Sequence, residues 1–535
     1  MPTTLFIGGS LFDGVAYRGR FGALVVRDGL VEALTDRPVE VEADQVVELR
    51  GGLVLPGFID AHVHPVQGGL ERTRCDLSAL ATREQILRHI GEYAATHPDL
   101  PWILGGGWSL AAFPGGTPLA ADLDAVVSDR PVFLVNRDHH GAWVNSRALA
   151  LVEAADPADG YFERDERGVP TGAVHEGAMA AFERVMPPPT RAQMRAGLLA
   201  GQAYLHSVGV TGWQDALVGE YSGIADPGPT YAEAAASGEL TGDVVGALWW
   251  DRERGPEQIA DLIERRAAYS GGRFRATSVK IMQDGIVENF TAALGSPYLD
   301  RCGRSTTNAG HGFLTRDALR EAVAACDAAG FQVHVHAIGD RGVRDALDAF
   351  AALGPTQRRT ERRHHIAHLQ LVEPSDVARF AAHGVAANLQ QLWACREEQM
   401  EELTIPFLGS ERVAWQYPFG DLARAGARLT AGSDWPVSTP DPWQAIHVGV
   451  NRIEYGAATP PLGPEQALTL AQSLAAYTSG SAWLNGRENL AGRIAPGCAA
   501  DLVVTDRDPF AGPAEEIGAT RTIGTWVAGR RVHEA

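Results

Sequence analysis

The sequence reads PGFIDAHVHP from Pro56 to Pro65, an apolar run that ends in the pair His62 and His64. Side chains alternate along a β-strand, so residues i and i+2 face the same side. If this run is a strand, both imidazoles can reach one metal ion at its end. Packed histidines at the edge of a barrel show the same spacing, so the pair alone leaves both interpretations open.

Seven more short apolar runs follow, and amphipathic stretches lie between them. With the first run, taken as 55–64, the predicted strands are 209–216, 243–250, 277–285, 331–339, 363–370, 384–391 and 428–436. The intervening stretches, such as RDALREAVAACDAAG, end in glycine, which is typical of a helix C-terminus. Strand and helix alternate about eight times, which predicts an α/β fold, a (β/α)8 TIM barrel.

Three segments depart from this alternation. Residues 1–56 and 481–535 contain short β segments bounded by Gly and Asp, so we expect one small β-sandwich built from both termini. The barrel is then expected over 57–480. The segment at about 75–195 lies between the first two strands of the barrel and interrupts the alternation of strand and helix. It contains strand-like runs of its own, so we interpret it as an inserted α/β subdomain.

Later strand ends supply four more residues that can bind a metal. They are Lys280 in TSVKIMQDG, His336 in FQVHVHAIGD, His368 in HHIAHLQ and Asp434 in LTAGSDWP. Active sites of this fold collect at the C-terminal ends of the strands, which makes a chance arrangement improbable. His336 and His368 are preferred to their neighbours because they lie nearer the strand ends. We expect His334, His364 and His365 to pack or to support the ligands.

Lys280 is the single lysine of the chain, and the other basic residues among the 46 Lys and Arg are all arginine. A bias toward arginine codons explains the missing lysines but not the remaining one. Arginine stays protonated, whereas a desolvated lysine can become a neutral, nucleophilic amine. The alternative is chance survival on a surface loop.

Composition excludes several classes of protein. The 535 residues carry a net charge of −20, which argues against a nucleic-acid partner. No apolar run has the length of a membrane span, and the start MPTTLFIGGSLFDG lacks a basic segment before its apolar residues. The five cysteines are scattered and form no CxxC pair, which favours the reducing cytoplasm. The sequence does not fix the oligomeric state, and we expect a homodimer because this is the commonest oligomer of soluble proteins.

Several motifs together resemble the amidohydrolase superfamily. They are PGFIDAHVHP, the order HxH, Lys, His, His, Asp, and the tail GRIAPGCAADLVVTD. The runs DGIVENFTAAL, HVHAIGDRGVRDAL, GSDWPV and DHHGAWVNSRAL resemble more narrowly the YtcJ-like hydrolases of amidohydrolase family 3, the branch with N-substituted formamide deformylase. The resemblance covers nearly the whole chain.

The resemblance implies a binuclear metal centre. His62 and His64 would bind one metal ion with Asp434, while His336 and His368 would bind the second. Lys280 would be carboxylated by CO2 and bridge both ions. Imidazoles combined with oxygen ligands suit two Zn²⁺ ions, although other divalent metals fit as well. Asp434 would also be the catalytic acid and base in the hydrolysis of a C–N, amide-type bond.

The substrate is expected to be a small N-acyl or N-formyl compound with an apolar or aromatic group. Candidate substrate-binding residues lie near strand ends or in family-like motifs: Trp213, Asp284, Glu288, Asn289, His140, Trp393 and Trp435. The chain departs from the family after its seventh strand, where Gln390-Gln391-Leu392-Trp393 replaces the frequent Gln-Pro-x-His. This departure puts the transfer of any relative's substrate in doubt.

Other functions on the same barrel remain open. A deaminase of this superfamily has a glutamate soon after the fifth-strand histidine, whereas His336 is followed by AIGD. An esterase, lactonase or phosphotriesterase could use the same bridged metals. A structural or regulatory protein without catalysis would be expected to have lost ligands, and here none is lost.

Overall fold

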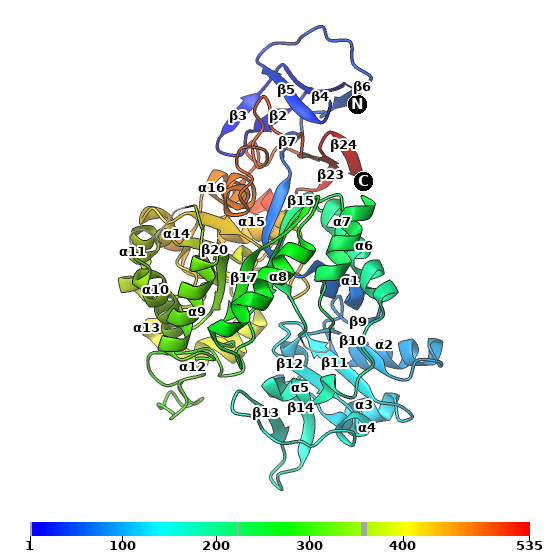
Figure 1. Cartoon of the computed structure of the whole chain (residues 1–535), viewed down its shortest axis with the longest axis vertical. Helices are drawn as coiled ribbons and strands as arrows, with labels where there is room; N and C mark the ends of the chain where they lie inside the picture. The colour runs from blue at the N-terminus through cyan, green and yellow to red at the C-terminus, as the bar shows by residue number, and fades with distance from the viewer. Residues whose placement is uncertain (1–2, 222–223, 355–360) are drawn as a thin grey trace.

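The computed structural model describes residues 3–221, 224–354 and 361–535 of the chain. Its central feature is a sheet of eight parallel strands (Figure 1). In spatial order they are β8 (Phe58–Val63), β15 (Val210–Val218), β16 (Asp243–Trp249), β17 (Phe274–Met282), β18 (Gln332–Ala337), β19 (His365–His368), β20 (Ala386–Leu389) and β21 (Leu429–Ala431). The eight predicted strands are thus present, and the TIM barrel is confirmed.

The barrel closes where its first strand meets the segment that follows its last. The backbone N–H of Asp434 donates to the carbonyl of His62 at 2.7 Å, and that of His64 donates to the carbonyl of Trp435 at 2.8 Å. Gly432 lies so close to β8 that a Cβ there would be 2.5 Å from the His62 nitrogen. This contact requires glycine, and it fixes Asp434 beside the two histidines.

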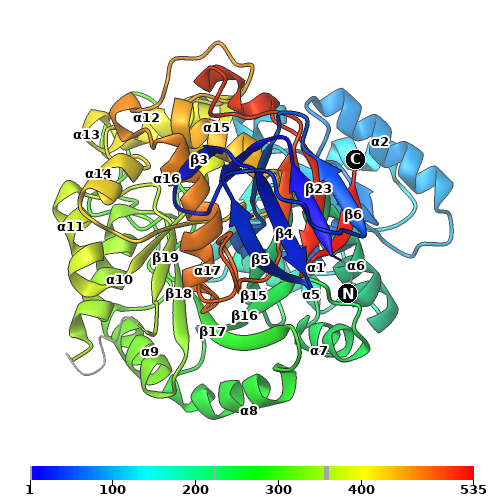
Figure 2. The ribbon, with the colours of Figure 1, turned by 90° about the horizontal axis from the view of Figure 1, so that it is seen from above.

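Helices surround the barrel, as the view from above shows (Figure 2). Those that follow the strands include α6 (Arg191–Ser207), α7 (Gly228–Ser237), α8 (Ile259–Tyr269), α9 (Arg316–Ala328), α10 (Asp340–Ala352), α11 (Pro374–His383), α14 (Phe419–Arg424) and α15 (Pro442–Asn451). Helix α9 illustrates how they form: Thr315 caps its N-terminus by accepting from Ala318 N, and Leu319, Val323 and Cys326 are buried on one face.

Both ends of the chain contribute to two sheets at one end of the molecule (Figure 1). One contains β1 (Thr4–Ile7), β4 (Ala23–Arg27), β5 (Leu30–Thr35) and β6 (Gln45–Glu48); the other contains β2 (Ser10–Phe12), β3 (Tyr17–Arg20), β7 (Leu53–Pro56), β22 (Leu502–Thr505), β23 (Thr522–Val527) and β24 (Arg530–Glu534). Phe6 and Trp526 pack edge to face between them, with ring centroids 5.1 Å apart. Strand β7 leads directly into β8, so this region anchors the start of the barrel.

The segment between α1 (Pro65–Arg72) and α6 forms a six-stranded sheet at the other end of the molecule (Figure 1). It contains β9 (Cys75–Asp76), β10 (Ile103–Trp108), β11 (Val132–Asn136), β12 (Gly141–Val144), β13 (Gly160–Arg164) and β14 (Pro170–Glu176), with helices α2 (Arg83–Thr96) and α3 (Ala120–Val126). Trp108, Phe113 and Trp143 pack in its core. Within the described part of the chain, no helix has the length and apolar character needed to cross a membrane.

Candidate metal centre

The six side chains predicted to bind metal meet at the C-terminal end of the barrel. His62 lies in β8 and His64 directly follows that strand, Lys280 lies in β17, His336 in β18, His368 at the end of β19 and Asp434 beyond β21. All six line one cavity. Parallel strands end at the same edge, which explains how residues so far apart in sequence meet here.

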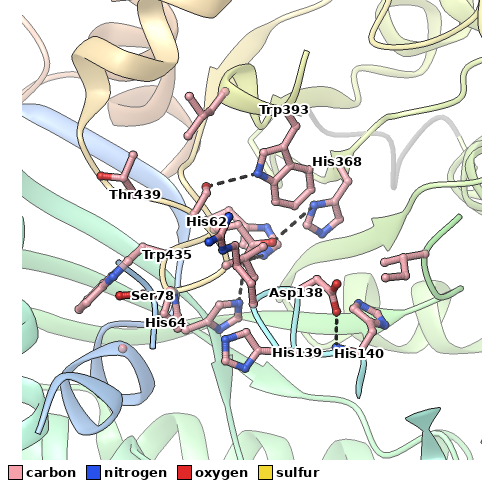
Figure 3. Close-up of a pocket in the computed structure, with 18 of the residues that line it drawn as sticks. His62, His64, Ser78, Asp138, His139, His140, His368, Trp393, Trp435 and Thr439 are labelled. Atoms are coloured by element: carbon pink, nitrogen blue, oxygen red, sulfur yellow. Dashed lines mark hydrogen bonds and ion pairs between the residues drawn. The ribbon is translucent and has the colours of Figure 1, made fainter. Parts of the chain in front are cut away.

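Asp434 is the centre of the cluster. Its Oδ1 lies 3.0 Å from His64 Nε2 and 3.3 Å from His62 Nε2, and its Oδ2 lies 3.8 Å from His368 Nδ1. Lys280 Nζ lies 3.3 Å from His62 Nε2. The rings of His336 and His368 are adjacent, with centroids 4.3 Å apart. His62 and His64 thus lie on one side of Asp434, and His368 with His336 on the other. Figure 3 labels His62, His64 and His368 of this cluster.

The donor set fits a divalent metal. Ligand atoms of His62, His64 and Asp434 all lie within 4.8 Å of one another. His368 is buried, yet neither of its ring nitrogens has a hydrogen-bond partner among the described residues, and the same holds for His64 Nδ1. Buried polar atoms without partners are costly, and metal coordination would satisfy them.

Burial sets the charge of the two innermost groups. It lowers the pKa of His62 to about 3, with a further contribution from Lys280, so this imidazole is neutral. Burial also lowers the pKa of Lys280 to about 7. A neutral imidazole is the form that binds metal, and a neutral amine is the form that reacts with CO2.

A second layer of residues orients the ligands. His334 Nε2 lies 2.9 Å from His62 Nδ1, which directs the other nitrogen of His62 toward Lys280 and Asp434. Asp284 Oδ1 lies 3.3 Å from His336 Nδ1 and serves the second group in the same way. Such partners fix the ring orientation and tautomer of a metal-binding histidine.

The histidines that the sequence left as supporting residues lie away from the donor atoms. His365 Nδ1 lies 3.2 Å from Asn388 Nδ2, and its ring packs against that of His334. His364 is on the outside of the barrel, where Nδ1 accepts from Val333 N and Nε2 lies 3.2 Å from Asp327. His364 precedes β19 and His365 is its first residue, and neither lines the cavity.

The cavity has a volume of about 570 Å³, which is in the range of small-molecule sites. Barrel loops and the inserted sheet both line it. Trp393 stacks parallel to His368 with centroids 5.4 Å apart, and Trp435 packs edge to face on Tyr204 at 5.3 Å. Figure 3 shows both tryptophans with His139 and His140 of the insert around the metal ligands.

Of the predicted substrate-binding residues, His140, Glu288, Trp393 and Trp435 line this cavity. The other three are placed elsewhere. Trp213 points outward from β15 toward α7, where it is buried and donates to Tyr231 Oη. Asp284 is buried behind His336, and Asn289 donates to the carbonyl of His140.

His140 is held in the cavity wall by a buried carboxylate. Both oxygens of Glu176 lie 3.0 Å from its Nδ1, and Thr291 donates to Glu176 at 2.7 Å. Burial opposes the charge, but Glu176 raises the pKa of His140 to about 9. The insert therefore places a cationic imidazole 5.7 Å, between centroids, from the ring of His336.

Several residues that line the cavity were missed in the sequence. Asp138 and His139 belong to the run DHH, in which only His140 was selected, so this motif contained the signal. Gln67 and Glu71 lie one and two turns into α1, on the face turned toward His139. Glu397 and Tyr417 lie in loops with no motif, and no sequence signal identifies them.

Comparison with known proteins agrees with this geometry. Residues 45–533 match the model of a family described as Amidohydrolase family. YtcJ of Bacillus subtilis (strain 168) is 28% identical, with 98% of each chain covered. N-substituted formamide deformylase of Arthrobacter pascens is 26% identical, over 91% of this chain and 89% of that one.

A solved structure described as an uncharacterized metal-dependent hydrolase, from Pyrococcus furiosus, matches with a TM-score of 0.70. It is 26% identical and the match covers 95% of this chain and 99% of that one. Because the family match spans most of the sequence, and because His62, His64 and Asp434 lie where they could hold a metal ion, this protein belongs to the amidohydrolase family and is a metal-dependent hydrolase.

Proposed function

We propose that this protein hydrolyses the C–N bond of a small N-formyl or N-acyl compound. The observation that carries the proposal is the meeting of six ligand-type side chains, from five strand ends, in one cavity of small-molecule size. The similarity to N-substituted formamide deformylase supports an amide-type bond and a formyl or acyl group. The aromatic walls formed by Trp393 and Trp435 support an apolar or aromatic part of the substrate.

The centre would hold two divalent metal ions, with zinc as the expected metal. His62, His64 and Asp434 would bind one ion, and His336 and His368 the other. The neutral amine of Lys280 would attack the carbon of CO2, form an N–C bond and release one proton to solvent, so that the resulting carbamate bridges the two ions. When bound, such ions lower the pKa of a water molecule and polarise a carbonyl group.

The chain's own residues supply proton transfer and orientation. Asp434 Oδ2 is the oxygen directed away from His64, and it would accept the proton of the attacking water and pass it to the leaving nitrogen. General acid–base transfer of this kind contributes roughly 10²–10⁴-fold. His140 and the aromatic walls would hold the substrate and exclude bulk water.

The test is a panel of N-formyl and N-acyl amines of graded size, assayed with metal-loaded protein whose metal content is measured. Release of the free amine with the carboxylic acid supports the proposal. Ammonia release from amino-purines or pyrimidines, or turnover of esters alone, would overturn it in favour of a deaminase or an esterase.

Two variants test the roles of named residues. Asp434→Asn should retain metal and lose turnover by at least ~10²-fold, whereas Asp317→Asn, an exposed aspartate on α9, should match wild type. Lys280→Arg keeps the charge but cannot take up CO2, so it should lose bound metal and activity. Normal turnover in either site variant would refute its assigned role.

A further inference from the structure

Three carboxylates from three parts of the fold line the cavity alongside the metal ligands. Asp138 lies between β11 and β12 of the insert and is labelled in Figure 3, Glu288 follows β17, and Glu397 follows β20. The pKa of Glu288 is raised to about 7, mainly by burial and to a smaller extent by the charges of Asp138 and Glu397. The three groups thus share one cavity, and the charges of the other two act on Glu288.

Only part of this negative charge is neutralised within the protein. Glu288 accepts a hydrogen bond from Thr404 at 2.6 Å, and Asp138 accepts from the backbone N–H of His140 at 2.9 Å. Among the described residues, Glu397 forms no ion pair and its carboxylate accepts no hydrogen bond. Burial raises the pKa of Glu397, and the positive charge of Arg137, which also lines the cavity, opposes this rise. The His140 imidazole acts in the same way on Asp138, so Glu288 is the carboxylate without a cationic neighbour among the causes of its pKa shift.

The cavity is also lined by Tyr417, whose hydroxyl group has no hydrogen-bond partner among the described residues. Tyr417 is only 3% exposed. Burial raises the pKa of this phenol well above its usual range, and the charges of Glu288 and Glu397, which line the same cavity, add to the rise. A buried hydroxyl without a partner calls for a ligand that can hydrogen-bond to it.

The remaining lining is also acidic. Apart from the metal ligands, the cavity is lined by six carboxyl groups, Glu71, Asp76, Asp138, Glu288, Glu397 and Glu454, and by three cationic groups, Arg72, Arg137 and the His140 imidazole. Burial raises the pKa of Glu71 to about 8, so five carboxyl groups remain to set against the three cations at neutral pH. The guanidinium of Arg72 lies over the ring of Tyr204 at 4.1 Å. The excess of negative charge is thus a property of the cavity and not of one residue.

We propose that Glu288, Glu397, Asp138 and Tyr417 form a subsite for a protonated amine, so that the substrate is an N-formyl or N-acyl compound with a second, cationic nitrogen. This inference rests on the proposed function and adds the chemistry of the substrate's far end. It is called the ammonium subsite below.

An alkylammonium group fits these residues better than other occupants. It donates up to three hydrogen bonds, to carboxylate oxygens and to the Tyr417 hydroxyl, and charge-assisted bonds of this kind are the strong ones. An aromatic ring adds a cation–π contribution. A neutral apolar group would instead cover the half-buried carboxylates of Glu288 and Asp138 without supplying a cation, which is costly. Calcium would prefer six to eight oxygen ligands, and the aromatic wall does not supply them.

The test compares two substrates that differ only at the far end. N-formylcadaverine carries an ammonium group where N-hexylformamide has a methyl group, and shorter and longer homologues form the same kind of pair. The measured quantity is the ratio of kcat/KM for the cationic over the neutral member. Wild type should favour the cationic member by about tenfold or more, since a hydrogen bond to a charged group contributes about 1.5–3 kcal/mol.

Glu288→Gln and Glu397→Gln should each lower this ratio by about tenfold, because the amide keeps the size and removes the charge. Glu402→Gln is the matched control, since Glu402 is exposed near the same loop and does not line the cavity. Glu397 has no partner to lose, so its variant should fold even if Glu288→Gln does not. A wild-type ratio at or below one, or an unchanged ratio in Glu397→Gln, overturns the proposal.

A binding measurement separates this inference from the proposed function. Titration calorimetry with cadaverine and with hexanol requires no turnover. Binding of cadaverine, weaker in Glu397→Gln than in Glu402→Gln, supports the ammonium subsite even if no formamide is hydrolysed. Hydrolysis of N-hexylformamide without cadaverine binding, or binding of calcium in place of cadaverine, overturns the subsite and leaves the hydrolase intact.

Discussion

Replacing Asp284 with asparagine should weaken the metal site without touching a ligand. The carboxylate of Asp284 is fully buried, accepts three backbone N–H groups and lies next to the ring of His336. Oδ1 accepts from the backbone N–H of Ile338 at 3.0 Å and lies 3.3 Å from His336 Nδ1, while Oδ2 accepts from Gly339 N at 2.8 Å and from Ala293 N at 3.0 Å. An amide has only one oxygen, so its NH2 group must face at least one of these donors.

The least costly orientation puts the NH2 group at the Oδ1 position. There it opposes the N–H of Ile338 and leaves a buried donor unsatisfied, which costs about 1–3 kcal/mol of stability. It also donates toward His336 Nδ1, which forces the proton of this ring onto Nε2. A protonated nitrogen cannot bind a metal ion, and the loss of such a supporting group lowers metal affinity by roughly 10–100-fold.

The assay is metal affinity by chelator competition together with urea denaturation of the metal-free protein. Asp317→Asn, whose carboxylate is exposed on α9, controls for the chemical change itself. If Asp284→Asn binds both metal equivalents as tightly as Asp317→Asn and unfolds at the same urea concentration, the role assigned to Asp284 is refuted.

Three further predictions concern other parts of the site. His334→Phe should weaken metal binding by roughly tenfold in the same competition assay, because His62 Nδ1 loses its partner at 2.9 Å; unchanged affinity would contradict this. The ratio of kcat/KM for the cationic over the neutral substrate should increase as the pH rises through about 7, because Glu288 then becomes charged while an alkylammonium group stays protonated to ~10. A pH-independent ratio in wild type, or the same rise in Glu288→Gln, would argue against this prediction. Trp393→Ala should lower kcat/KM for N-benzylformamide relative to N-methylformamide by about 2–10-fold through loss of an aromatic contact beside His368, and equal losses for both would count against an aromatic pocket.

The core of the site could be predicted because it follows from local rules. Alternation along a strand places His62 with His64, and parallel strands end at one edge, which is why Lys280, His336 and Asp434 could be assigned together. The choice of His336 over His334 used the same rule, and the structure places His334 one layer deeper, under His62.

The same local reading failed where orientation depends on packing. Asp284 lies two residues beyond β17, where a loop side chain can turn either to the cavity or to the barrel wall; three backbone N–H groups and the ring of His336 hold it at the wall. Trp213 lies in a strand, but its side chain faces outward and is buried by α7. The positions of these two residues in the sequence do not reveal which way their side chains point.

The sequence by itself determined the barrel, the order of its ligands and the unusual position of Lys280, since all of these follow from periodicity and residue chemistry along one strand at a time. Only the tertiary structure decided what surrounds these ligand-type side chains. Asp138, Glu397 and Tyr417 come from an inserted sheet and from loops without periodicity, and their charges interact because separate segments fold over the same opening. Local patterns position strand ends, whereas the walls of a cavity arise from contacts between distant segments.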